Sequence, residues 1–214
     1  MKLRIVSLSL LALCLVALPA VAQQIIYSNG PINGTTDAWT INSGFVVSDT
    51  FNVTAPPNVD AEEVKFGAWV FPGDVLQSVY VSITSSEFGG TSYFDQVVNF
   101  TQSGCSGNQY GFNVCTETGT FTSVNLAVGT YWLNLANAVV NTGDPIYWDE
   151  NSGPSSASEN SVGTIPSESF TILGNSSTSS TTTSSGGTVP EPSSIMLLGS
   201  GILGLAGVLR RKLF

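Results

Sequence analysis

The sequence contains no histidine and very few basic residues. Of its six lysines and arginines, only Lys65 lies between Gln23 and Val189, whereas 14 of the 15 acidic residues lie there. These 14 acids and one lysine give the central region a formal charge of −13. Nucleic-acid binding rests on lysine and arginine side chains that neutralise phosphates, so we expect none here. Small cations are the partners that such a field attracts.

The lack of histidine also narrows the chemistry that the chain can perform. No Ser-His or Cys-His pair can form, and a single central lysine gives little basis for a Ser-Lys pair. Paired carboxylates could cleave glycosides, but among 14 acidic residues such pairs arise by chance. We therefore expect no enzyme, and a glycoside-active enzyme is the least favoured alternative.

Cysteine is scarce as well. Cys14 lies in the apolar N-terminal run, which leaves Cys105 and Cys115, with nine residues between them. This spacing is too wide for a CxxC redox or zinc pair, and without histidine a zinc site cannot be completed. In an exported chain, two such cysteines predict a structural disulfide that closes a small loop.

Helical spacing and helix caps are also missing from the region 23–173. Apolar residues alternate instead, as in "VKFGAWVF", where Val64, Phe66, Ala68 and Val70 share one parity. A period of two places these side chains on one face of a strand. Turn-formers such as Asn33-Gly34 and Pro56-Pro57 separate the short apolar segments. The pattern predicts an all-β domain, an antiparallel β-sandwich of the jelly-roll kind.

The first 22 residues are typical of a secretory signal peptide. Lys2 and Arg4 precede an apolar run, and Ala20-Val21-Ala22 provides the small residues that signal peptidase requires. Cleavage after Ala22 is therefore expected, with Gln23 as the new N-terminus.

The C-terminal part divides into a linker and an apolar segment. Residues 174–188 are rich in Ser, Thr and Gly and predict a flexible linker. Residues 193–209 are uncharged and would span about 26 Å as a helix, enough for a short transmembrane segment. Arg210, Arg211 and Lys212 follow directly, and positive charges stay in the cytoplasm. A cleaved signal and this stop-transfer segment agree in topology, with the central domain outside.

Residues 189–214 combine Val189-Pro190-Glu191-Pro192, a glycine-rich apolar span and a terminal Arg-Arg-Lys cluster. This combination resembles the PEP-CTERM sorting signal of Gram-negative bacteria. It implies recognition by exosortase, a membrane protease, followed by removal of the tail and delivery to the cell surface or an extracellular polysaccharide matrix. The central region is also similar to uncharacterised domains found ahead of this signal, through "FGAWVFPGD", "GTYWLNLANAV" and "GDPIYWDENSGPS".

Two tryptophans suggest a glycan platform. By parity, Trp69 and Trp132 fall on the more polar side of their strands, and aromatic faces in such places stack on sugars. The alternative is that a loop or second layer covers them, since tryptophan is usually well buried.

A calcium site is the second binding hypothesis. Asp144, Asp149 and Glu150 lie within a loop-like acidic stretch, and calcium takes six to eight oxygen ligands. The spacing matches no EF-hand loop, and solvated acids are the alternative. No other cofactor is expected.

Taken together, these features predict an exported protein of the cell surface or extracellular matrix with a structural or adhesive role. The alternative is a carbohydrate-binding module, supported by calcium, whose partner is extracellular polysaccharide. Exosortase, signal peptidase and the membrane are the partners expected during processing.

Overall fold

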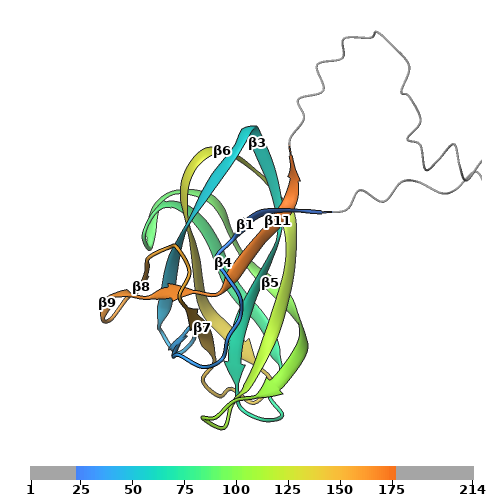
Figure 1. Cartoon of the computed structure of the whole chain (residues 1–214), viewed down its shortest axis with the longest axis vertical. Helices are drawn as coiled ribbons and strands as arrows, with labels where there is room; N and C mark the ends of the chain where they lie inside the picture. Colours follow the sequence, from blue (N-terminus) through green and yellow to red (C-terminus); the bar gives the residue numbers. More distant parts are fainter. Residues whose placement is uncertain (1–22, 177–214) are drawn as a thin grey trace, which may run out of the picture. The chain divides into compact units, whose positions relative to one another are not determined.

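The computed structural model describes residues 23–176, which form an all-β domain (Figure 1). No helix occurs within this range. The strands are β1 (Gln24–Ser28), β2 (Ala38–Thr40), β3 (Val46–Val70), β4 (Leu76–Ser86), β5 (Gly89–Gly107), β6 (Asn113–Val140), β7 (Tyr147–Asn151), β8 (Ala157–Glu159), β9 (Gly163–Ile165), β10 (Ser167–Glu168) and β11 (Phe170–Ser176).

The predicted signal peptide and sorting segment lie outside the described residues, as does the linker beyond Ser176. Within residues 23–176 there is no helix that could span a membrane. The last strand, β11, runs to Ser176, past the domain end expected at 173, and Asn175 pairs with Asp60 of β3.

Three strands are much longer than the sequence predicted. β3 has 25 residues, β5 has 19 and β6 has 28. The expected turn at Pro56-Pro57 is wrong, because β3 continues through it with a register shift between Val53 and Asn58. Proline has no N–H to donate to the ladder, so it interrupts the pairing with β6 without reversing the chain.

The long strands let one antiparallel sheet curl around the core. The strand order is β1-β11-β3-β6-β4-β5, and β5 also pairs with β6. The start of β6 pairs with the end of β5, whereas the end of β6 pairs with β4 (Figure 1). The all-β, sandwich-like architecture is therefore confirmed, while the jelly-roll connectivity stays a prediction.

The core follows the alternation seen in the sequence. Val64, Phe66, Ala68 and Val70 are all fully buried, as the parity of β3 predicted. On β4, Val81 and Ile83 face the core, so the intervening even-numbered residues face outward. Together β4, β5 and β6 thus present an outer face that is rich in small polar side chains.

Candidate functional site

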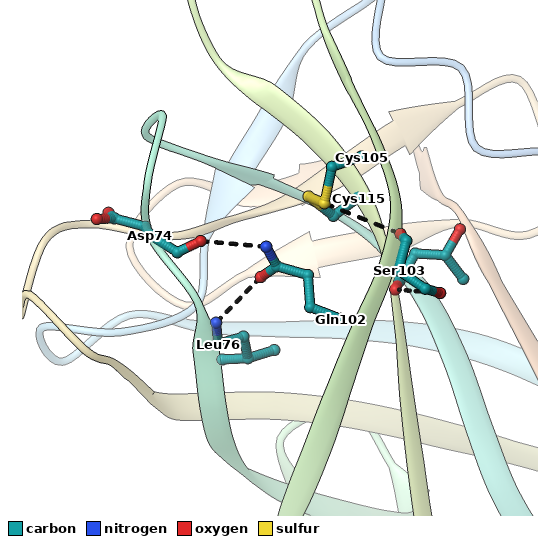
Figure 2. Close-up of a disulfide and its surroundings, with 7 residues drawn as sticks. Asp74, Leu76, Gln102, Ser103, Cys105 and Cys115 are labelled. Carbon is teal, nitrogen blue, oxygen red and sulfur yellow. Dashed lines mark hydrogen bonds between the residues drawn. A yellow bond between two sulfur atoms is a disulfide. The ribbon is translucent and has the colours of Figure 1, made fainter.

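The predicted disulfide is confirmed. Cys105 of β5 and Cys115 of β6 are joined with an S–S distance of 2.08 Å, beside the loop that links the two strands (Figure 2). Close by, Gln102 accepts the Leu76 N–H and donates to the Asp74 carbonyl, each at 3.1 Å. These contacts tie β5 to both of its neighbours, and a disulfide over a loop of this size contributes about 2–3 kcal/mol.

Trp69 does not form an exposed platform, so this part of the glycan hypothesis is wrong. Its side chain is only 5% exposed and lies under Tyr110, with ring centroids 5.4 Å apart and an interplanar angle of 20°. Its indole N–H donates to Asp149 Oδ1 at 2.6 Å. The β5–β6 loop covers the ring, which is the alternative that burial statistics favour for tryptophan.

The three residues of the calcium hypothesis do not come together as one ligand set. Asp149 is buried, and its carboxylate accepts from the Trp69 indole and from the backbone N–H groups of Asn33 and Gly34 at 2.8 and 2.9 Å. Glu150 accepts from the Trp39 indole at 3.0 Å, while Asp144 is exposed. Among residues 23–176, no group of three or more acidic, cysteine or histidine side chains is placed to hold a metal ion.

A groove of about 470 Å³ lies on the outer face of β4, β5 and β6. We call it the outer groove. Ser82, Thr84 and Asn134 line it along the strands, and Tyr80, Phe88 and Asn160 also border it. Asn134 organises this site, because its amide donates to the hydroxyls of Ser82 (3.1 Å) and Thr84 (2.9 Å). Its carbonyl accepts the Phe88 N–H at 3.2 Å, which fastens the β4–β5 turn to the groove.

Trp132 lies beside the outer groove, as its parity predicted. It is half-buried and pairs in register with Thr84, which lines the groove, and with Thr50 of β3. Directly paired residues of neighbouring strands have their side chains close together on one face. Among the described residues, the Trp132 indole N–H has no hydrogen-bond partner. The Trp132 half of the platform hypothesis stays a prediction.

Two groove residues have backbones in the left-handed region. Phe88 has φ 55° and Asn137 has φ 48°, and only Ser43 is a further non-glycine residue with positive φ in the described chain. A bulky side chain in this left-handed region is unusual and costs on the order of 1–3 kcal/mol. Sequence reasoning missed Phe88, although an aromatic residue directly before Gly89-Gly90 in a turn was a signal for it.

Tyr80 and Asp95 form a polar pair at the edge of the outer groove. The Tyr80 hydroxyl donates to Asp95 Oδ1, and this hydrogen bond is the main cause that raises the pKa of Tyr80. Asp95 is exposed, so its carboxylate can also accept hydrogen bonds from a ligand.

A second hollow of about 460 Å³ lies beside the disulfide, between residues 32–35 and the β5–β6 hairpin. The side-chain amides that line this hollow form hydrogen bonds with the loops around it. Asn33 donates to the Glu150 carbonyl at 3.0 Å and Asn108 to the Gly34 carbonyl at 3.3 Å. The Asn108 carbonyl also accepts two backbone N–H groups of the hairpin loop. These side chains therefore shape the fold of the loops.

Three carboxyl groups inside the domain were not predicted as notable. Burial raises the pKa of Asp49 to about 6. Hydrogen bonds from the Ser155 side chain, from the backbone N–H groups of Glu168 and Thr50 and from the Asn29 side chain act in the opposite direction. Burial, and then the charge of Asp49, raise the pKa of Glu168 well above its usual range. Burial alone raises the pKa of Glu117 to about 8. Asp49 shares the parity of core residue Phe51, which was the available signal for its burial.

Comparison with known proteins identifies the C-terminal segment. The family model of the PEP-CTERM protein-sorting motif matches residues 188–212. Neither the curated proteins nor the solved structures gave a match. The matched range contains the Val189–Pro192 sequence and the basic cluster that suggested this signal. Residues 188–212 of this chain are therefore a PEP-CTERM sorting motif, which implies an exported protein that is membrane-anchored before exosortase processes it.

Proposed function

We propose that this chain is a cell-surface or extracellular-matrix protein of a Gram-negative bacterium, and that its β domain has a structural and adhesive role. The observation that carries the proposal is the sorting motif at residues 188–212, downstream of a β domain that ends at Ser176. The serine- and threonine-rich tract between them would hold the domain away from the point of attachment.

The construction of the domain supports a role outside the cell. The Cys105–Cys115 disulfide persists in oxidising compartments. The central region carries 14 acidic residues and one lysine, so it stays soluble and repels anionic lipid. A carbohydrate-binding role is the alternative. The outer groove favours this role over that of a glycoside-active enzyme, which no observation on the described residues supports.

The sorting part of the proposal is tested by intact mass. The protein from wild-type cells is expected to lack the C-terminal tail, whereas cells without exosortase should retain it. Replacing Pro190, Glu191 and Pro192 by alanine should reproduce the exosortase defect, because it removes the recognition sequence. A matched triple-alanine variant at residues 181–183 of the linker should be processed normally.

The adhesive part is tested with a strain that lacks the protein, which should aggregate less and release more matrix. Complementation with the wild-type chain should restore both properties. Full-length protein with both termini uncut in the cytosolic fraction would contradict the proposal. So would unchanged aggregation of the deletion strain.

A further inference from the structure

We propose that the outer groove binds a neutral polysaccharide, with Phe88 and Trp132 as stacking surfaces. This inference rests on the proposed adhesive function and names the partner of the domain. It depends on three features of the groove: the accessible aromatic rings, the polar groups between them and the absence of positive charge in the described part of the chain.

The Phe88 ring is available to a ligand. Its side chain is 41% exposed, and it packs against no other aromatic ring of residues 23–176. Its backbone is held at φ 55°, where glycine or asparagine would be unstrained. The Asn134 carbonyl fixes this conformation by accepting the Phe88 N–H. Backbone strain of this kind clusters at functional sites, so the strained backbone of Phe88 is a reason to assign its exposed ring a function.

Trp132 and Tyr80 extend the aromatic surface along the same face. Trp132 is half-buried, pairs with Thr84 and has an indole N–H without a partner among the described residues. Tyr80 lines the groove with its hydroxyl directed to Asp95. Aromatic rings with a polar atom offer both a flat apolar surface and a hydrogen bond, which is what a sugar ring with its hydroxyls requires.

Polar groups lie between these rings. Ser82 and Asn134 are buried and hydrogen-bonded to each other, so they form the polar floor of the groove. Asn137 and Asp95 line the groove with exposed side chains, and the Asn137 amide is not engaged by any described residue. A few placed polar groups on an otherwise preformed surface are typical of small-ligand sites.

Charge decides which class of polysaccharide the groove accepts. Lys65 is the one basic residue within residues 23–176, and it pairs with Glu63 at 3.1 Å. The groove therefore has no described cation to meet a uronate, sulfate or phosphate, and Asp95 would repel such groups. A neutral polysaccharide needs no cation in the groove and is not repelled by Asp95.

The test measures binding of the processed protein, purified from the extracellular fraction, to laminarin, dextran and galactomannan, with alginate as the charged comparison. The key variant is Phe88→Asn. Because asparagine tolerates positive φ, this variant should melt at the same temperature as wild type or higher, yet lose at least tenfold in affinity for the neutral glycan. Trp132→Ala should also lose at least tenfold.

The matched control is Phe71→Asn, at a phenylalanine that is 37% exposed and packs against Phe112 outside the groove. It should bind like wild type. The inference is overturned if wild type binds no neutral glycan, if it prefers alginate, if Phe88→Asn binds normally, or if Phe71→Asn loses binding equally. Surface delivery is measured separately, so a groove variant that reaches the surface but does not bind leaves the sorting proposal intact.

Discussion

Glu117 is a carboxylic acid inside the apolar core. It lies on β6, paired in register with Phe66, and both of its carboxyl oxygens are buried without a hydrogen-bond partner in the described domain. Burial raises its pKa from 4.5 to about 8, so the side chain is neutral at pH 7. The core therefore tolerates this residue as an acid with a proton, at a cost in stability.

The raised pKa determines how Glu117 affects stability. The folded state holds the Glu117 proton more tightly than the unfolded state does, because its pKa for this group is higher. The resulting contribution to the unfolding free energy is fully present below pH 4.5 and is lost as the pH rises through about 8. Glu117→Met removes the group that must stay protonated. We expect this variant to be more stable than wild type by about 1–3 kcal/mol at neutral pH.

The advantage of Glu117→Met should grow from about pH 5 to about pH 9, because only wild type is penalised by ionisation. Urea unfolding followed at several pH values measures it. Glu87→Met, at an exposed position in the β4–β5 turn, is the control and should show no such pH trend. A constant difference across the range would refute the protonated state of Glu117.

Sequence parity could have identified Glu117 and Asp49, since both share the parity of core residues on their strands. It correctly placed Val64 and Phe66 inside and Trp132 outside. It failed at Trp69, whose face is outward by parity but covered by Tyr110. Alternation states which side of the sheet a residue takes, and it carries no information about which loop lies on that side.

At the scale of elements, β7 joins the loop of residues 32–35 to the sheet. Asp149 of β7 is the connection, because its carboxylate accepts three N–H groups, from Asn33, Gly34 and Trp69. Asp149, which the sequence suggested as a calcium ligand, thus attaches the loop of residues 32–35 to β7. A carboxylate with several donors is a strong acceptor, and each donor is left unsatisfied when it is removed.

Asp149→Asn keeps the size of the side chain but turns one acceptor oxygen into a donor that faces another N–H. We expect a loss of about 3 kcal/mol in unfolding free energy and increased exposure of Trp69. Chemical denaturation and tryptophan fluorescence measure the two effects. Asp144→Asn, at the exposed neighbour in sequence, should stay within about 0.5 kcal/mol of wild type. Equal stability of both variants would contradict the role given to Asp149.

The length of β3 is an element-level result that the sequence did not predict. Pro56-Pro57 resembles a turn locally, yet β6 pairs with β3 on both sides of it. Tertiary pairing outweighs local turn preference here, because hydrogen bonds on either side hold the chain direction through the irregularity.

At the scale of the whole molecule, like charges dominate the surface. Eight of the 14 acidic residues of the central region are buried, and the other six lie at least partly at the surface with a single lysine. The surface carboxylates repel one another, which destabilises the compact folded state. Raising the ionic strength with NaCl from about 0.01 to about 1 M shortens the screening length roughly tenfold. We therefore expect unfolding free energy to rise by about 1 kcal/mol.

This salt effect should shrink near about pH 4, where many exposed carboxylates are protonated. Thermal or urea unfolding at both pH values gives the comparison. Destabilisation by NaCl at neutral pH would show that specific ion pairs, such as Lys65–Glu63, outweigh the general repulsion.

The amino-acid sequence by itself determined the strand alternation, the pairing of Cys105 with Cys115, the acidic charge and the sorting motif at residues 188–212. Each of these depends on residue type and on short spacing along the chain. The tertiary structure alone decided that Tyr110 covers Trp69 and that Phe88 reaches the groove beside Asn134. Such placements depend on contacts between residues far apart in sequence, and those contacts exist only once β4, β5 and β6 have paired.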